Sequence, residues 1–499
     1  MLRPSLRAAA VLALVSADLV IGAAGCTRRN EDFCCTTVAA CERHGGDGEL
    51  VRCPADSDRP YCDNEHRTCI EPPGTPCGPE GECADPDTPI CFDGLCVECG
   101  GAADCPFSDP VCGEADHQCE SCSEASDCGA FADRPFCDGG ACVGCRNGDD
   151  CQAASAPICD EVDGTCRGCT SGAECDSDVC DWVSGGCVDE RDVLYVATDG
   201  SGDSCTRDDP CDSVMQAVAL ASGGQTWILM AEGSYQETVS IDGETIRIVA
   251  DGADIRPSTI DSAAFDVRGG ADLRISGLHI HDADGNGDGP GDGVYCTNTG
   301  GASTLLLDRV QIDGNDDQGV DANSCDLTIS RSTLSDNRRG GISLDSVDFD
   351  ITNNFIVANG SGSVSAGVLI DKNPPARGRL EHNTIAANIN PAGSPSGIRC
   401  VLVGNPIAFR NNIVFGNQGS ATQVDGENCE HRYSVIGPNG VSGDGNIATP
   451  PDFVSETDFH LMAGSSGIDA AEESDVAIDV DGQPRPGGDQ NDIGADELP

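Results

Sequence analysis

An asparagine recurs at a fixed offset in the second half of the chain, and this repeat constrains the fold more than any other feature. Each of five apolar anchor residues is followed by an apolar residue five positions later and by an asparagine eight positions later. The anchors are Leu307, Ile329, Ile351, Leu380 and Phe409, and the asparagines are Asn315, Asn337, Asn359, Asn388 and Asn417. The anchors are 22, 22, 29 and 29 residues apart. A unit this short cannot bury its own apolar face, so it must stack on copies of itself.

A glycine followed by a β-branched residue marks a second corner of four units. These pairs are Gly319-Val320, Gly341-Ile342, Gly367-Val368 and Gly397-Ile398. After each glycine, residues should alternate between inward and outward positions, and the inward set is small or apolar. Short β-rich units with Asn and Gly at the corners predict an all-β parallel β-helix, with coils over residues 239–420. Stacked asparagines would form a hydrogen-bonded ladder between coils.

The net charge of the chain limits the binding partners that it can have. The 499 residues include 28 basic and 85 acidic side chains, which gives a formal net charge of −57. This excess of negative charge argues against binding to nucleic acid or to anionic lipid. It suits a solvated extracellular surface, and it is compatible with calcium.

The N-terminus has the features of an export signal. Arg3 and Arg7 precede an apolar run that ends in Ala23-Ala24-Gly25-Cys26, which predicts a signal peptide over residues 1–25. Small residues before a cysteine resemble the lipobox of bacterial lipoproteins, although Ala23 stands where that family usually has leucine and Asp18 interrupts the apolar run. The resemblance implies a lipid on Cys26 and attachment to the outer membrane. The alternative is ordinary secretion with Cys26 in a disulfide.

Most of the 33 cysteines lie between Cys26 and Cys187. Residues 77–187 hold five modules of four cysteines, and five residues always separate the first two. Modules of this size have too little core to fold unaided, so we expect two disulfides in each, with three pairings open. The C-x-x-C junctions could mean zinc or redox chemistry, but junctions between disulfide modules explain them more simply. The array resembles cysteine-rich repeats of exported bacterial proteins, and we expect a disulfide-rich stalk over residues 26–190.

Residues 191–238 have the pattern of an N-terminal cap. We expect a strand over 194–197, a Cys205–Cys211 disulfide, a helix over 213–221 capped by Asp212 or Ser213, and a strand over 227–230. Such a helix would cover the open edge of the first coil. The stretch resembles the N-terminal segment of pectin-lyase-like β-helix proteins, which implies a right-handed solenoid. We also expect Cys296–Cys325 and Cys400–Cys429 to tie one coil to the next.

The C-terminal segment, residues 450–499, carries an ordered set of short motifs. These are Asp458-Phe459-His460-Leu461, Gly464 to Ala470, Asp479 to Pro486, and Asp492 to Glu497. Their order and spacing resemble the tail of bacterial surface β-helix proteins of the choice-of-anchor Q type. The resemblance implies an exported or surface protein and no particular activity.

One acidic loop has the start of a calcium-binding pattern. The segment Asp282-Ala283-Asp284-Gly285-Asn286-Gly287 fits D-x-[DN]-x-[DN]-G, and Asp288 and Asp292 add carboxylates. The closing glutamate of the pattern is missing, so a solvated acidic loop is the alternative. A weaker candidate is the set Asp479, Asp481, Asp489 and Asp492, which could equally be turn-forming residues.

The outward face after the corner glycines holds the candidate catalytic residues. Asp321, Asp345 and Asp371 are expected to form a row there, with Lys372 and Arg399 nearby. β-Helix pectate lyases and polygalacturonases act on such a face, and Asp316-Asp317 resembles the paired aspartates of polygalacturonases, whose histidine and R-x-K motifs are absent. The sequence therefore favours a non-enzymatic surface protein that binds polysaccharide or another cell. The alternative is a calcium-dependent polysaccharide lyase or glycoside hydrolase that acts on acidic glycans.

Overall fold

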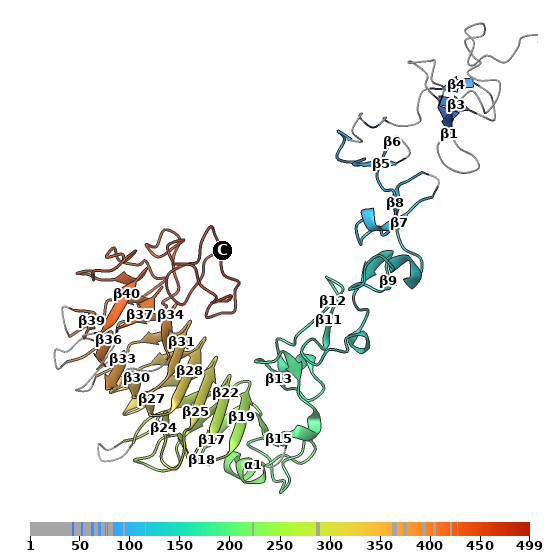
Figure 1. Ribbon diagram of the computed structural model, residues 1–499. Helices are drawn as coiled ribbons and strands as arrows, with labels where there is room; N and C mark the ends of the chain where they lie inside the picture. Colours follow the sequence, from blue (N-terminus) through green and yellow to red (C-terminus); the bar gives the residue numbers. More distant parts are fainter. Residues whose placement is uncertain are drawn as a thin grey trace, which may run out of the picture. The chain divides into compact units, whose positions relative to one another are not determined.

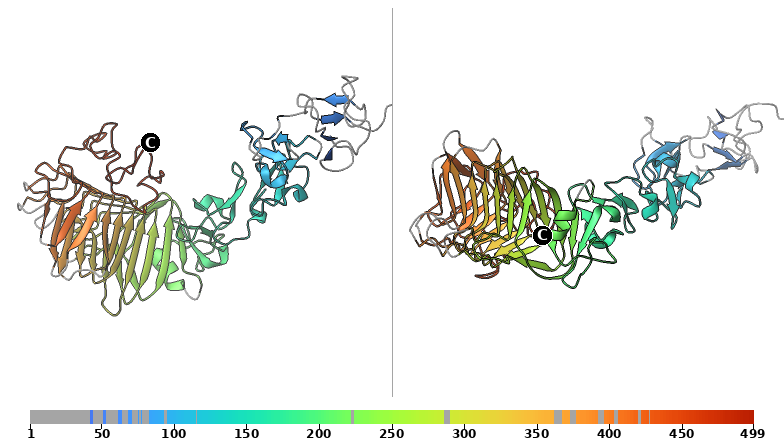
Figure 2. Two further views of the ribbon diagram at one scale, coloured as in Figure 1. Left: turned by 45° about the horizontal axis from the view of Figure 1, so that its top comes forward. Right: turned by 90° about the horizontal axis from the view of Figure 1, so that it is seen from below.

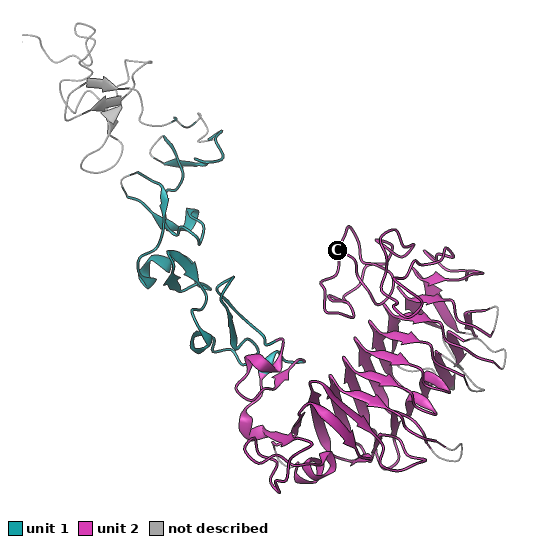
Figure 3. Cartoon of the chain, turned by 180° about the vertical axis from the view of Figure 1, so that it is seen from behind, with its two compact units in different colours: residues 1–169, 183–186 teal, residues 170–182, 187–499 magenta. Residues whose placement is uncertain are grey.

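The computed structural model describes residues 95–499, except 115, 222–223, 286–289, 362–366, 373–376, 392–395, 403–405, 420–421 and 427, together with residues 83–92 and a few short segments before them. The expected signal peptide, Cys26, Asn286, Asp288 and the side chain of Lys372 lie outside this description. The chain divides into two compact units (Figure 3). Unit 1 comprises residues 1–169 and 183–186, and unit 2 comprises residues 170–182 and 187–499.

Each cysteine module contains one short antiparallel hairpin, and these hairpins follow one another over residues 90–187. The hairpin strands are β5 (Ile90–Phe92), β6 (Leu95–Val97), β7 (Val111–Cys112), β8 (Cys119–Glu120), β9 (Phe136–Asp138), β10 (Ala141–Val143), β11 (Ile158–Asp160), β12 (Thr165–Arg167), β13 (Cys180–Asp181) and β14 (Gly186–Cys187). A four-stranded sheet precedes them, with β1 (Glu42–Arg43), β2 (Val51–Arg52), β3 (Tyr61–Asp63) and β4 (Thr68–Ile70). Among the described residues, five short 3-10 helices connect the strands: η2 (Ala102–Asp104), η3 (Ala125–Cys128), η4 (Gly148–Asp150), η5 (Gly172–Glu174) and η6 (Glu190–Asp192).

The disulfides select one of the three pairings that the sequence leaves open. The first cysteine of a module pairs with the third and the second with the fourth, as in Cys99–Cys112 and Cys105–Cys119. The same order holds for Cys122–Cys137 with Cys128–Cys142 and for Cys145–Cys159 with Cys151–Cys166. Several cysteine sulfurs lie close enough together to suggest a metal group, but these cysteines are disulfide-bonded and offer no thiolate.

Unit 2 is a parallel β-helix built from three sheets (Figures 1 and 2). Sheet A has ten strands: β15 (Val193–Val196), β16 (Trp227–Met230), β19 (Thr245–Ala250), β22 (Asp272–Ser276), β25 (Thr304–Asp308), β28 (Asp326–Ser330), β31 (Phe349–Thr352), β34 (Gly378–Glu381), β37 (Ile407–Arg410) and β40 (Cys429–Arg432). Sheet B has nine: β17 (Gly233–Gln236), β20 (Ala253–Arg256), β23 (His279–His281), β26 (Gln311–Asp313), β29 (Thr333–Ser335), β32 (Phe355–Val357), β35 (Thr384–Ala386), β38 (Ile413–Phe415) and β41 (Val435–Ile436). Sheet C has eight: β18 (Val239–Asp242), β21 (Phe265–Arg268), β24 (Val294–Thr297), β27 (Gln318–Asn323), β30 (Gly340–Asp345), β33 (Val368–Lys372), β36 (Ile398–Leu402) and β39 (Val424–Asp425).

Each coil supplies one strand to each sheet, and inward side chains of successive coils stack into one continuous core. In sheet A, for example, Ile275, Leu307, Ile329 and Ile351 pair in register along the solenoid and are fully buried. Alternation along each strand places polar residues on the outer faces. The predicted fold class, an all-β parallel β-helix behind a disulfide-rich array, is confirmed.

The predicted asparagine ladder lies at the corner that follows sheet B. The Asn337 side chain donates to Asn359 Oδ1 (3.0 Å), Asn359 donates to Asn388 Oδ1 (3.0 Å), and Asn388 donates to Asn417 Oδ1 (2.9 Å). The same oxygens accept from backbone N–H groups, such as that of Asn337 (3.1 Å). These asparagines are buried, and each follows a residue in the left-handed region, such as Asp336 (φ 55°) or Ala358 (φ 57°). The ladder therefore satisfies backbone groups that these sharp corners leave without sheet partners.

The corner glycines are required by the ladder of the next coil. A Cβ atom on Gly319 would lie 2.8 Å from both Asn337 Nδ2 and the carbonyl oxygen of Gly341. The two sequence motifs, asparagine and glycine, are thus two sides of one contact between consecutive coils.

Helix α1 (Val214–Leu220) covers the N-terminal end of the solenoid. Ser213 is the N-cap, and its hydroxyl accepts from the Gln216 backbone N–H (3.2 Å). The Glu237 carboxylate accepts from the backbone N–H groups of Val214 (3.0 Å) and Met215 (3.1 Å), where the helix dipole favours negative charge. Val214, Ala217 and Val218 join the solenoid core, whereas Leu220 is exposed. Among the described residues, no helix has the length and apolarity needed to cross a bilayer.

Three disulfides stabilise the solenoid at separate places. Cys205–Cys211 closes the loop before α1, and Cys296–Cys325 and Cys400–Cys429 each link neighbouring coils.

The C-terminal tail, residues 450–499, returns over the outer face of sheet B. Phe355, Val357 and Ala386 on that face pack against Phe459 and Ala495 of the tail. The later strands of sheet B are therefore shielded from solvent, while sheets A and C present polar faces.

Candidate functional site

The outer face of sheet C carries the predicted acidic residues, in two columns rather than one row. Asp321 pairs in register with Ser343, whereas Asp345 pairs with Asn323 on one side and with Asp371 on the other. The reason is their distance from the corner glycines. Asp321 is the second residue after Gly319, while Asp345 and Asp371 are the fourth after Gly341 and Gly367. The expected single row of three aspartates is thus corrected to a column of two, with Asp321 in the neighbouring column.

Tyr295 lies in the same column as Asp321 and between two carboxylates. It pairs in register with Asp266 on β21 and with Asp321 on β27. Burial raises the pKa of the Tyr295 phenol, and Asp321 and Asp266 add to the shift. A cavity of about 380 Å³ adjoins the ring, and Arg268, Thr297 and Thr299 contribute to its lining. Sequence reasoning does not single out this tyrosine, because its significance depends on the register of three strands.

Two further carboxylates, those of Asp292 and Asp317, lie beside Asp321 and complete a group of three. Asp292 is only 2% exposed, and its Oδ1 accepts from the Gln318 backbone N–H (2.9 Å). Oriented to satisfy both groups, the Gln318 side-chain amide donates to Asp317 Oδ1 (2.6 Å) and to Asp292 Oδ1 (3.0 Å). Arg339 donates to Asp317 Oδ2 (3.2 Å). Asp292, which belongs to the predicted calcium loop, therefore lies among groups associated with the predicted catalytic face.

The three carboxylates hold protons more strongly than ordinary aspartates. Burial raises the pKa of Asp321 to about 6, and the charges of Asp317 and Asp345 add to the shift, while a hydrogen bond from Ser343 opposes it. Burial also raises the pKa of Asp292 well above its usual value, with Asp321 and Asp317 contributing. The pKa of Asp317 is raised by burial, and Arg339 opposes this shift. Such a group can share protons or attract a cation.

The other predicted residues of this face lie farther along the solenoid. Arg399 occupies the column of Asp321 but three strands away, which is about 14 Å at the spacing of neighbouring strands. It pairs in register with Leu369 and Asp425. Lys372 ends β33, and its side chain lies outside the described residues. Arg399 and Asp321 therefore could contact one extended ligand but not one small molecule.

In the described part of the predicted calcium loop, two of the carboxylates contact other protein groups. Asp282 and Asp284 are exposed, and the Asp282 carboxylate pairs with His281 Nδ1 (3.0 Å). Asp292 faces Gln318 instead. In the tail, Asp479 and Asp492 accept backbone N–H groups, as turn-forming residues do.

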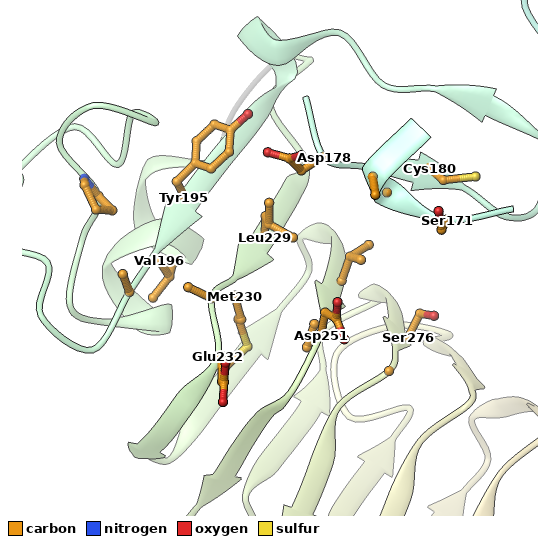
Figure 4. Close-up of a pocket in the computed structure, with 18 of the residues that line it drawn as sticks. Ser171, Asp178, Cys180, Tyr195, Val196, Leu229, Met230, Glu232, Asp251 and Ser276 are labelled. Atoms are coloured by element: carbon orange, nitrogen blue, oxygen red, sulfur yellow. The ribbon is translucent and has the colours of Figure 1, made fainter. Parts of the chain in front are cut away.

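Another cavity of unit 2 lies at the first strands of sheet A, and its lining contains none of the predicted site residues. Its volume is about 800 Å³, and Figure 4 shows Leu229 and Met230 between Tyr195 and Asp178 on one side and Asp251 and Glu232 on the other. Arg207 at its rim is engaged, because it pairs with Asp178 and donates to the Tyr195 hydroxyl (3.0 Å).

These observations define a class: a disulfide-rich repeat protein with a parallel β-helix that presents polar outer faces. Residues 237–374 and 292–446 match the family model described as a right handed beta helix region. Among solved structures, the chain is similar to pectate lyase Pel9A, with 16% sequence identity, 62% of this chain and 96% of that chain covered, and a TM-score of 0.37. No curated protein matches the chain.

Proposed function

We propose that this protein is an exported, surface-anchored bacterial protein that binds polysaccharide along the outer face of sheet C. The observation that carries the proposal is Tyr295, an aromatic ring placed beside a cavity on a polar sheet face. An aromatic ring offers an apolar surface on which the C–H face of a sugar can stack. The surrounding carboxylates, hydroxyls and the Arg268 guanidinium supply the convergent polar groups that orient a ligand.

The negative charge of this face bears on the kind of polysaccharide. Asp266, Asp321, Asp345 and Asp371 all lie on it, so an acidic glycan would be repelled unless a cation bridged the two. We therefore propose calcium as a bridging or stabilising ion, with Asp282, Asp284, Asn286, Asp288 and Asp292 as the ligand set to test. Chelation should lower the melting temperature, and Asp284→Ala should remove that effect. An unchanged melting temperature on chelation would remove calcium from the proposal.

A direct test measures glycan binding by the full chain. Tyr295→Ala should abolish binding of the glycans that an array identifies, whereas Tyr295→Phe should retain it because the ring remains. Tyr433→Ala, a tyrosine at a turn after sheet A, provides a control for general loss of aromatic contacts. Full binding by Tyr295→Ala would refute the assignment of sheet C as the binding face.

A second candidate function is cleavage of acidic glycans by lyase or hydrolase chemistry. The specific observation in its favour is Asp321, whose pKa of about 6 would let it act as a general acid near neutral pH, with Asp317 and Asp345 as neighbouring carboxylates. Incubation with polyuronates should then give unsaturated products for a lyase or new reducing ends for a hydrolase. Turnover that Asp321→Asn or Asp345→Ala abolishes would replace the binding proposal with the enzymatic one.

We propose attachment to the outer membrane through a lipid on Cys26, with the cysteine modules as a spacer. The support is the signal-like N-terminus and the disulfide-rich array, which requires an oxidising compartment. Cys26→Ser should move the protein from the membrane fraction to the soluble exported fraction. An unchanged membrane fraction would remove the lipid anchor.

A further inference from the structure

A second groove crosses the outer face of sheet A, away from the site described above. It has a volume of about 660 Å³ and runs across β22, β25, β28, β31 and β34, which lie side by side in Figure 1. Its lining includes Arg274, Leu306, Thr328, Asp350 and Arg379. These five residues form one outward column, because each pairs in register with the next.

Two polar atoms in this column are buried without a hydrogen-bond partner among the described residues: Arg274 Nε and Asp350 Oδ1. Two ion pairs of the groove are also too long for hydrogen bonds, although Arg379 is engaged elsewhere, by Glu381 (2.8 Å) and by Asp475. Arg274 Nε is 3.8 Å from Asp272 Oδ1, and Arg379 Nη1 is 3.8 Å from Asp350 Oδ2. A buried donor and a buried acceptor left unpaired cost free energy. The rest of each side chain is accessible, with Arg274 29% exposed and Asp350 44% exposed, so a ligand can hydrogen-bond to their remaining polar atoms.

The chemistry of the column defines the class of ligand. A hydroxyl group can accept from Arg274 and can donate to Asp350, so a hydroxyl-rich molecule satisfies both ends. Leu306 and the Thr328 methyl group lie between them and offer an apolar floor for the C–H face of a sugar ring. Four carboxylates and three guanidinium groups line the groove, so their charges nearly cancel and a strongly charged ligand is not favoured.

The length of the groove and the paired backbone of sheet A exclude other classes of ligand. Arg274 and Asp350 lie three strands apart, about 14 Å at the usual strand spacing, so the ligand must be a short chain rather than a single small molecule. A peptide would need backbone partners such as an open sheet edge offers, but this groove lies on a sheet face whose backbone groups are paired within the sheet. We propose that this groove binds a neutral oligosaccharide that lies along the solenoid axis, with Arg274 and Asp350 as its hydrogen-bonding anchors.

The inference does not rest on the proposed function of sheet C, and the test separates the two faces. Binding of cello-, manno- and chito-oligosaccharides to the full chain is measured by calorimetry. Arg274→Gln and Asp350→Asn should each weaken binding of the recognised oligosaccharide about tenfold or more, since each removes a hydrogen bond to a charged group. Tyr295→Ala should leave this binding unchanged.

Arg247→Gln is a matched control, because Arg247 occupies the same column one strand before the groove. Melting temperatures of all variants check that the solenoid is folded. The proposal is overturned if the wild-type chain binds none of these oligosaccharides. It is also overturned if the two groove variants bind them as well as the wild type, or if Tyr295→Ala alone removes the binding.

Discussion

The Asn359 side chain forms hydrogen bonds with several backbone and side-chain groups at once. Its Nδ2 donates to the Leu334 carbonyl (2.9 Å) and to Asn388 Oδ1 (3.0 Å), and its Oδ1 accepts from the Asn337 backbone N–H (3.1 Å). Asn359→Ala would leave these buried groups unpaired. We expect the free energy of unfolding to fall by about 3 kcal/mol. Urea unfolding measures it, and Asn323→Ala, an exposed asparagine of β27, should change it by less than about 0.5 kcal/mol.

The raised pKa of Asp321 predicts how the stability of the protein depends on pH. Its pKa is raised from 3.8 to about 6 in the folded protein, so between these values the folded state binds more protons than the unfolded state. Stability from this group is therefore complete below about pH 4 and is lost as the pH rises through about 6. Asp321→Asn should stabilise the protein by about 1–2 kcal/mol at pH 7.5 relative to pH 4, since two pKa units correspond to about 2.7 kcal/mol before solvent screening. Parallel stability–pH curves for the two proteins would contradict the raised pKa.

At the scale of residues, the structure contains one asparagine ladder that we predicted from the sequence and one that we did not. Asn354, Asn383 and Asn412 form a second ladder at the corner after sheet A, with donor–acceptor distances of 2.9 Å and 3.1 Å. They lie three positions after Ile351, Leu380 and Phe409, so the signal was present. Serines occupy its ends, at Ser332 and Ser434, and hide the pattern. No sequence pattern predicts that Asp292 lies near Asp317, because the position of Asp292 depends on a loop that has no periodic sequence.

At the scale of elements, the tail depends on one buried guanidinium. Arg485 is 8% exposed, pairs with Glu497 (2.5 Å), and donates to the carbonyls of Gly494 (2.9 Å) and Ala495 (2.9 Å). It also reaches Asn353 Oδ1 (3.3 Å) at the corner between β31 and β32. Arg485→Ala leaves Glu497 buried without its partner. We expect a loss of about 3–5 kcal/mol in the stability of the docked tail.

Hydrogen exchange of residues 450–499 measures this loss directly, because exchange reports local opening. Arg338→Ala is the matched control, since the Arg338 side chain is mostly exposed and its pair with Asp316 is 3.8 Å long. Exchange of the tail should be unchanged in that variant. If Arg485→Ala also left tail exchange unchanged, the apolar contacts of Phe459 with Phe355 and Val357 would suffice to hold the tail.

Elements with a period were predictable, and contacts between distant elements were not. The strand over 227–230 and the N-cap at Ser213 follow from local apolar and capping patterns, and the structure has both. The position of the tail over sheet B depends on contacts such as Arg485 with Asn353, 132 residues apart. The strands of sheet B also carry outward apolar residues, Phe355 and Val357, whose neighbours are known only once the tail is placed.

At the scale of the whole molecule, the two units are stabilised by different means. In the described part of unit 1, the buried apolar side chains are those of cysteines, such as Cys99, Cys128 and Cys142, together with Pro110. Unit 2 has a continuous apolar core that extends from Leu194 to Ile436. Unit 1 therefore depends on its disulfides, each of which contributes about 2–4 kcal/mol, whereas unit 2 depends on burial of apolar surface.

Reduction should consequently affect the two units differently. With a phosphine reductant, we expect proteolysis to cleave residues 83–169 at many sites, while the thermal unfolding of the β-sheet signal by circular dichroism remains cooperative. The solenoid retains its core and its ladders even if Cys296–Cys325 and Cys400–Cys429 open, although its melting temperature should fall. The oxidised chain serves as the control, since cleavage there should be confined to few sites. Loss of the cooperative transition on reduction would show that the solenoid, too, requires its bridges, and would contradict a stability that comes from stacked coils.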